Sequence, residues 1–490
     1  MSWSSLEDLQ PILPELVLTL TVLCSLMIGV FRKENVLHTV SYLALAGLAI
    51  AGACSLIESP NYVAKAYQSF LITNYYIQMV QFLVIATTFL VLFSTFKHLV
   101  KDEIGAFEYP ILCLLSCLGM IILVSSNDLI TFFLGLELQS LPVYVMVAMA
   151  RKKPKVSEAA VKYFVLGIVA TAFLLFGSSY IYGLTGTTSF EGIALALKDA
   201  NILTFPFVFA FILLVSGLSF KISAVPYHMW TPDVYEGSPT PVTLFIASAP
   251  KLAALAFFMR FLFGPLSEFM GMWQPTIQAI SIASMVLGVF GALYQTNIKR
   301  LLAYSTISHI GYALVGVAAS STEGVKGVLV YITIYVIMTL GVFGILLNLR
   351  IQGKMPEDLD SLKGLSKTYP KMAAALGILV FSLAGIPPLA GFFGKFLVFV
   401  AAVNAGLYTL AIIGVLASVV GAAYYLRIIK LMYFDEPTTA ITGRKYDPTP
   451  SKETSLVVLA TTAFSFLFFV QPDPLIEYAE KAAAVLFEKE

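Results

Sequence analysis

The sequence predicts an all-α polytopic membrane protein with about fourteen transmembrane helices. Of its 490 residues 58% are hydrophobic and only 12% are charged, and the mean hydropathy is +0.86. A soluble domain carries about twice that fraction of charged residues. A helix that crosses a bilayer needs about 20 mostly apolar residues, and such stretches follow one another along almost the whole chain.

Fourteen apolar stretches are separated by short polar loops. The longest polar connections, Arg350–Lys371 and Asp435–Glu453, are too short to form a soluble domain. After the last stretch, Pro474–Glu490 has the pattern of an amphipathic helix on a membrane surface. The stretches begin near Ile12, Val40, Tyr75, Tyr109, Leu129, Ala160, Ile202, Pro241, Thr276, Leu301, Val325, Met372, Leu407 and Thr454.

The placement of basic residues predicts the orientation of these helices. With both termini outside, 20 of the 30 lysines and arginines fall on the inner side, 6, including Arg260, on the outer side, and 4 within spans. Such a bias follows the positive-inside rule. The sequence therefore predicts a multi-pass protein of the bacterial cytoplasmic membrane with both termini on the periplasmic side.

A weak internal repeat divides the single membrane domain, residues 1–490. The stretch Glu158–Tyr182 has the same rhythm as Gly324–Leu349, and a similar offset aligns Lys221 with Lys395. Spans 4–8 and 9–13 would then form two five-helix units, inverted because each contains an odd number of spans. Paired interrupted helices in inverted repeats point to a transport pathway. We expect spans 1–3 in residues 1–106, the two units in 107–264 and 265–434, and the last span with the amphipathic segment in 435–490.

The stretch from Ser216 to Lys251 contains the most unusual polar residues. Lys221 and Lys251 each lie within an apolar run, where a lysine costs about 2.5 kcal/mol or more unless it faces the protein interior, water or a counter-charge. Gly217 before Lys221 and Pro226 after it are both expected to weaken the helix, and the proline predicts that the helix ends or breaks there. The alternative is that the lysine snorkels toward the membrane surface. This alternative is stronger for Lys221, which is close to the loop, than for Lys251, which lies deeper in its span.

Four further ionisable residues lie in apolar spans. Glu137 is in the middle of its span, and the alternative to a functional carboxylate is a buried ion pair that holds helices together. Lys395 follows a break at Pro387–Pro388, whereas Lys162 lies near the inner end of its span and could snorkel. His309 is a candidate proton relay, because its pKa is ordinarily near neutrality, or a hydrogen-bonded core histidine.

These buried groups suit proton movement without a substrate pocket. Burial favours the neutral form of a lysine and a nearby carboxylate favours the charged form, so a lysine whose partner moves can release a proton. The chain has no pattern for a phosphate loop, haem, iron–sulfur cluster or metal site, and its four cysteines are isolated in apolar segments. The net charge of +1 gives no indication of nucleic-acid binding.

Three motifs together resemble one known family. PYHMWTPDVYEGSPTPVTLFIASAPKLAA, KRLLAYSTISHIGYALVG and FSLAGIPPLAGFFGKFLVF are similar to the antiporter-like subunits of the proton-pumping NADH:quinone oxidoreductase, respiratory complex I. TPDVYEG differs from the form typical of subunits M and L and of Mrp-type cation/proton antiporters. The resemblance covers nearly the whole chain.

The resemblance implies roles for named residues and for partners. The family's proton path would include Glu137, Lys221, Lys251 and Lys395, with Lys162 in the same network and His309 at a variable polar position. The family implies that NADH, FMN, iron–sulfur clusters and quinone are bound by partner subunits and that this chain binds no cofactor. The partners would be subunits M and L, the small subunits K, J, A and H, and the lipid bilayer.

The resemblance also implies that Glu137 modulates a lysine, Lys221 being the favoured partner. A subunit of a cation/proton antiporter, a subunit of a ferredoxin- or hydrogen-linked complex and a passive structural subunit remain alternative functions. The first two would use the same buried charges, whereas the third would need them only as ion pairs between helices.

Overall fold

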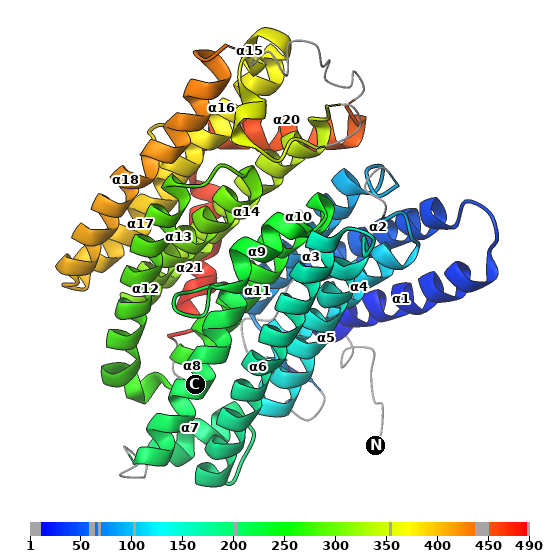
Figure 1. Ribbon diagram of the computed structural model, residues 1–490. Helices are drawn as coiled ribbons and strands as arrows, with labels where there is room; N and C mark the ends of the chain where they lie inside the picture. Colours follow the sequence, from blue (N-terminus) through cyan, green and yellow to red (C-terminus); the bar gives the residue numbers. More distant parts are fainter. Residues whose placement is uncertain are drawn as a thin grey trace.

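The chain is almost wholly helical in a computed structural model that describes residues 11–57, 64–66, 70–100, 104–198, 204–351, 355–436 and 450–487 (Figure 1). Within those ranges, 13 helices are long and apolar enough to cross a membrane. The predicted class, an all-α polytopic membrane protein, is confirmed.

α1 and α2 form one edge of the molecule, and α3 lies beside them toward its centre (Figure 1). α1 packs against α2, and α2 packs against α3. A short antiparallel hairpin precedes α3, with Lys65 opposite Ile72. The elements are α1 (Leu13–Phe31), α2 (Val36–Ser55), β1 (Ala64–Ala66), β2 (Leu71–Thr73) and α3 (Tyr75–Thr95).

The next helices contain the stretch around Lys221. α4 packs along α5, and α6 packs along α8. The elements are α4 (Glu108–Ser125), α5 (Leu129–Ala148), α6 (Pro154–Thr185), α7 (Phe190–Lys198), α8 (Phe205–Ile222), α9 (Trp230–Gly237), α10 (Thr240–Ala247) and α11 (Ala249–Phe263).

The same order of packing recurs in the following helices. α12 packs along α13, and α14 packs along α17, as expected if two units of five spans share one arrangement. The boundaries of these units stay predictions. The elements are η2 (Ser267–Phe269), α12 (Met270–Leu293), α13 (Ile298–Ala318), α14 (Thr322–Asn348), η3 (Leu359–Leu362), α15 (Leu365–Thr368), α16 (Pro370–Ala384), α17 (Ala390–Asn404) and α18 (Tyr408–Tyr433).

Both spans that the sequence predicts to be broken are broken. α8 ends at Ile222 and α9 begins at Trp230, with Pro226 between them. α16 ends before Gly385, whose φ of 87° lies in the left-handed region that glycine tolerates best. α16 and α17 are 15 residues each, shorter than a full span. Together they supply the fourteenth span beside the 13 long ones.

Gly217 has a different role from the predicted one. α8 continues through Gly217 without interruption. A Cβ atom at Gly217 would lie 2.3 Å from Cγ of Leu174 on α6. The residue therefore allows α8 to pack closely against α6, and the helix breaks only at its C-terminal end.

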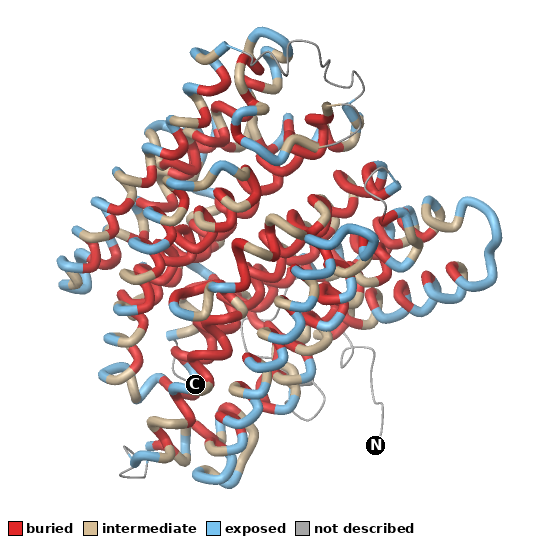
Figure 2. Tube along the Cα trace, in the orientation of Figure 1, coloured by how far each residue is buried: buried red, intermediate tan, exposed pale blue. Residues whose placement is uncertain are grey.

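The most buried helices lie at the centre of the bundle. α10, α11, α13 and α14 are buried along almost their whole length, whereas α1, α2, α6 and α18 expose one face each (Figure 2). Outer helices with one apolar exposed face suit contact with lipid. The central helices carry Lys251 and His309, so these two residues are inaccessible from the lipid.

Arg260 is buried and does not lie in a loop. The distribution of basic residues predicts it among the outer-side charges, and the structure places it in the last turn of α11 with 6% of its surface exposed. Its guanidinium donates to the Val124 carbonyl at 2.7 Å and to Oδ1 of Asn127 at 3.4 Å. Arg260 therefore ties the end of α11 to the end of α4.

The C-terminal helices cross the bundle to reach its first part. α21 packs against α14 and α3, and Lys326 forms an ion pair with Glu480 at 3.2 Å. The amphipathic helix expected in Pro474–Glu490 is present, but its buried alanines face protein. Residues 437–449, in the preceding connection, lie outside the described ranges. The elements are α20 (Lys452–Leu467), η4 (Phe468–Val470) and α21 (Asp473–Ala484).

Candidate functional site

The broken end of α8 places Lys221 against α5. The amine of Lys221, in the last turn of α8, donates to Oγ of Ser140 at 2.8 Å and to the hydroxyl of Tyr144 at 3.3 Å. Its Nζ also lies 5.8 Å from the centroid of the Tyr144 ring. Lys221 is thus held by neutral hydroxyls and an aromatic face, which can accept its hydrogen bonds in either protonation state.

Lys251 lies in the first turn of α11, on the other side of the same break. Only 1% of its surface is exposed. Its amine donates to Oγ of Ser223, the left-handed residue that ends α8, and Nζ lies 4.5 Å from the centroid of the Trp230 ring. Ser223 also accepts a hydrogen bond from Thr231 at 2.7 Å. The break in the helix therefore supplies the polar partners of this buried lysine.

A small cavity joins the two lysines. Lys221 and Lys251 both line it, together with Ser140, Tyr163 and Trp230, and its volume is about 10 Å³. This is roughly the space that one water molecule needs. The Tyr163 and Trp230 rings are stacked 4.5 Å apart and form one wall of the cavity. The two lysines therefore form one cluster, which we call the first lysine cluster.

Glu137 lies beside this cluster but does not contact Lys221. It is partly buried on α5 and accepts a hydrogen bond from Thr171 of α6 at 2.7 Å. It forms no ion pair with any residue in the described ranges. Ser140, the partner of Lys221, is three residues further along α5 and so lies on the same helix face. The structure shows no direct pair between Glu137 and Lys221, the partner that the resemblance favours.

Lys162 belongs to a separate network on the basic side, the end of the bundle where α5 meets α6 and α12 meets α13. It pairs with Glu158 at 2.6 Å and Asp233 at 2.7 Å. Arg300 pairs with the same Asp233 at 2.6 Å and with Glu236 at 3.1 Å. These groups, with Lys155, surround a cavity of about 140 Å³.

The ion-pair network joins the two halves of the molecule. It connects α6, α9 and α13, because Asp233 of α9 bonds both Lys162 and Arg300. Burial raises the pKa of Asp233, but the hydrogen bonds from Lys162 and Arg300 outweigh it and hold that pKa below its ordinary value. Asp233 therefore stays ionised at neutral pH. The arrangement explains the position of Lys162 better than snorkelling does.

Lys395 occupies the second break as Lys221 occupies the first. Its amine donates to the Ala384 carbonyl, the last residue of α16, at 2.9 Å and to Oγ of Ser418 on α18 at 2.8 Å. The C-terminal carbonyls of a helix lack helical partners and carry the negative end of its dipole, so they favour a cation. Lys395 is 6% exposed, and its Nζ lies 4.7 Å from the centroid of the Tyr312 ring.

His309 is enclosed by tyrosine hydroxyls near Lys395. Its Nδ1 shares a hydrogen bond with Tyr331 at 2.6 Å, and its Nε2 shares one with Tyr425 at 2.9 Å. The Tyr312 ring lies 6.0 Å from the imidazole and also faces Lys395. His309 is thus fully hydrogen-bonded, as either a relay or a core histidine would be. We call it, with Lys395, the second cluster.

Tyr235 of α9 lies between the two clusters. Its hydroxyl is buried and is one of the side-chain groups without a hydrogen-bond partner in the described ranges. Its neighbours include Tyr163, which lines the cavity of the first lysine cluster, and Tyr335, whose ring lies 5.0 Å from His309. The nearest polar side chain is the hydroxyl of Thr306. Sequence reasoning missed Tyr235. The available signal was its position in the TPDVYEG motif, within the broken span.

Comparison with known proteins shows the family. Residues 126–421 match the family described as "NADH:quinone oxidoreductase/Mrp antiporter, TM". The NADH-quinone oxidoreductase subunit N of Rhodospirillum rubrum is 47% identical over 98% of this chain and 97% of its own length, and that of Paramagnetospirillum magneticum is 46% identical over 98% of each chain. The chain belongs to the NADH-quinone oxidoreductase subunit N family.

Solved structures agree with that membership. A chain of respiratory complex I from Thermus thermophilus is 30% identical and covers 95% of this chain and 99% of its own, with a TM-score of 0.80. A chain of the Mrp complex from Dietzia sp. is 22% identical, covers 99% of this chain and 98% of its own, and has a TM-score of 0.85. The second likeness concerns the fold alone. This subunit N family member is therefore an antiporter-like membrane subunit of an NADH:quinone oxidoreductase.

Proposed function

We propose that this subunit translocates protons across the membrane while partner subunits transfer electrons from NADH to quinone. The observation that supports the proposal is the series of lysines placed at the two helix breaks in the interior of the bundle. Lys221 and Lys251 share one cavity, and Lys395 occupies the corresponding break in the second half. Apolar residues of similar volume would often stabilise the fold as well as buried charges do, so a purely structural role leaves this pattern unexplained.

The hydrogen-bond partners of these lysines suit proton transfer. Within the described ranges Lys221, Lys251 and Lys395 bond hydroxyl or carbonyl oxygens and form no ion pair. A lysine without a fixed carboxylate partner can exist in either protonation state, whereas an ion pair would hold the proton in place. A path would run from the first lysine cluster past Tyr235 to His309 and Lys395. Glu137 would act on the first cluster through its charge.

The redox chemistry would belong to other chains. The chain would bind no cofactor itself, and NADH, FMN, iron–sulfur clusters and quinone would be held by partner subunits. The membrane partners would be the antiporter-like subunits M and L and the small subunits K, J, A and H. This subunit would therefore carry out proton translocation, and electron transfer would take place in the partner subunits.

Glu137→Gln tests whether the carboxylate has a functional role. Glutamine can still accept the hydrogen bond from Thr171, so the assembled complex should be unchanged. Loss of the negative charge disfavours the protonated form of the nearby lysines. We therefore expect proton pumping to fall, and to fall most at high pH, so that its optimum moves to lower pH. Glu137→Asp, which keeps the charge, should retain part of the activity.

Proton uptake into inverted membrane vesicles, recorded from about pH 6 to about pH 9, measures this effect. This range includes the pKa of about 7–8 to which proteins lower a lysine that transfers protons. NADH oxidation with a water-soluble acceptor gives the amount of assembled complex. Normal pumping by Glu137→Gln over that whole range would make the carboxylate structural and would favour a passive subunit.

The orientation is a second prediction, and it rests on the bias in basic residues. The proposed location is the bacterial cytoplasmic membrane with both termini on the periplasmic side. In a variant whose native cysteines are replaced, a cysteine at Lys152 should react with an impermeant reagent only from the cytoplasmic side. A cysteine at Gly192 should react only from the periplasmic side. Reversal of both results would overturn the orientation, and reversal of one would overturn the number of spans between them.

A further inference from the structure

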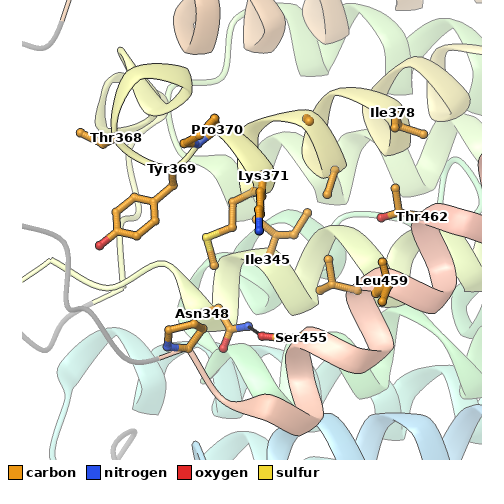
Figure 3. A pocket seen from close by; sticks show the side chains of 15 residues that line it. Ile345, Asn348, Thr368, Tyr369, Pro370, Lys371, Ile378, Ser455, Leu459 and Thr462 are labelled. Carbon is orange, nitrogen blue, oxygen red and sulfur yellow. Dashed lines mark hydrogen bonds between the residues drawn. The ribbon is translucent and has the colours of Figure 1, made fainter.

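We propose that the groove between α16 and α20 binds one anionic phospholipid, with its phosphate at Lys371 and an acyl chain along the two helices. The groove has a volume of about 790 Å³, and it is lined by the end of α14, the start of α16 and the first turns of α20 (Figure 3). This volume lies in the range of small-molecule binding sites, about 300–1,000 Å³. Nothing in the proposed proton path uses these residues.

The polar and apolar ends of the groove have the order of a phospholipid. Tyr369, Lys371 and Asn348 lie toward one end, whereas Ile378 and Leu459 lie toward the other, where Thr462 is the one polar lining residue (Figure 3). The polar end coincides with the level at which α14 ends and α16 and α20 begin, so it marks the membrane interface. Tyrosine and lysine are typical of that level.

The length of the groove suits an acyl chain. Lys371 and Ile378 are seven residues apart on α16, which corresponds to about 10 Å along a helix. The facing pair Ser455 and Thr462 has the same separation on α20. An acyl chain in the groove would therefore run from the interface well into the hydrocarbon layer. Ala375 is one of the residues that would contact it.

The charge at the polar end selects the headgroup. Lys371 is exposed and forms no ion pair with a residue in the described ranges, so its charge is available to a phosphate. The nearby Lys367 already pairs with Glu436 at 3.2 Å. The floor of the polar end is closed by a hydrogen bond from Asn348 to Ser455 at 3.3 Å, so the amide is fixed (Figure 3). The anion would be bound by Lys371.

Photo-crosslinking in the assembled complex tests the proposal. A benzophenone amino acid replaces Ala375, which lines the groove, or Ala460, which is exposed on α20 outside it. The complex is reconstituted in vesicles of equal parts phosphatidylglycerol and phosphatidylcholine, and crosslinked lipids are identified by mass spectrometry. At position 375 we expect phosphatidylglycerol to be enriched about fivefold, the factor that one basic residue contributes near a membrane surface. At position 460 the captured lipid should match the bulk ratio.

The variant Lys371→Gln separates a lipid site from ordinary lipid contact. It should return the ratio at position 375 to that of the bulk, whereas Lys430→Gln, on an exposed lysine of the basic side, should leave the enrichment unchanged. Equal ratios at positions 375 and 460, or enrichment that survives Lys371→Gln, would refute the anionic site. A crosslink at position 375 to a protein segment would also refute it, because a partner subunit would then fill the groove.

Discussion

A complex that carries Lys221→Met should assemble normally and translocate almost no protons. Methionine has a similar length and is apolar, so it can fill the space of the lysine side chain. Ser140, which loses the amine, keeps its own hydrogen bond to the Leu136 carbonyl at 2.7 Å, whereas the hydroxyl of the buried Tyr144 loses the amine as a partner. The loss of one such hydrogen bond costs about 1–3 kcal/mol, which is small for a bundle of this size. We expect proton uptake per NADH to fall about 10²-fold or to the detection limit, the lower range for a positioned proton-transfer group.

Two further variants control for shape and for charge. Lys221→Arg keeps a cation that can still reach Ser140, but a guanidinium effectively cannot release its proton, so pumping should fail here too. Lys198→Met removes an exposed lysine far from either helix break and should pump normally. Full pumping by Lys221→Met, with normal amounts of assembled complex, would contradict proton transfer at this residue and would leave it a structural role.

The overall architecture could be predicted because membranes restrict it severely. An apolar stretch of 20 residues has few alternatives to a spanning helix. Pro226, together with the Pro387–Pro388 pair, indicated where two of those helices break, because proline cannot continue the hydrogen-bond ladder. Gly217 was misinterpreted for an equally clear reason. A glycine can mark either a break or a close contact between helices, and only the position of Leu174 on α6 distinguishes the two.

The candidate site could be predicted only in part. Buried lysines and a buried glutamate stand out in an apolar span, so Lys251 and Glu137 were recognisable from their neighbours in sequence. Their partners were not, because Ser223 and Thr171 are ordinary hydroxyl residues whose relevance depends on how helices pack. Glu137 and Lys221 form no contact because α6 supplies the partner of Glu137, Thr171, whereas Lys221 of α8 bonds Ser140 on α5. Which helices pack against α5 is not visible in the sequence.

Charged residues in loops were hardest to interpret. Arg300 follows a short loop between two spans and resembles an ordinary residue of the basic side. The structure shows that it shares Asp233 with Lys162 and thereby joins α13 to α6. Exposed ion pairs are individually worth little, with a median of about 0–1 kcal/mol. A shared carboxylate that contacts both halves can nevertheless fix their relative position, which no pattern of single residues reveals.

Tyr235→Phe should uncouple the two clusters without weakening the fold. The substitution removes a single oxygen atom, and that hydroxyl is buried, has no well-formed hydrogen bond in the described ranges and lies next to the Thr306 hydroxyl. Thr306 keeps its own bonds with the Leu302 carbonyl and the Tyr335 hydroxyl. Removal of an unpaired buried hydroxyl is neutral or slightly stabilising, so assembly should be unchanged. If the hydroxyl bonds a transferred proton or a water on the path, its loss removes ~1.5 kcal/mol of hydrogen bonding, which corresponds to about tenfold in rate.

A double variant decides whether Tyr235 lies on the same path as the first lysine cluster. Two steps of one path are not additive, so Glu137→Gln, which should leave measurable pumping, combined with Tyr235→Phe should pump no less than the slower of the two single variants. Tyr408→Phe, which removes a hydroxyl from an exposed tyrosine, should pump normally and controls for the substitution itself. Normal pumping by Tyr235→Phe would mean that protons do not pass between α9 and α13 at this hydroxyl. Each half of the molecule would then need its own connection to the membrane surfaces, and the buried tyrosine would serve packing alone.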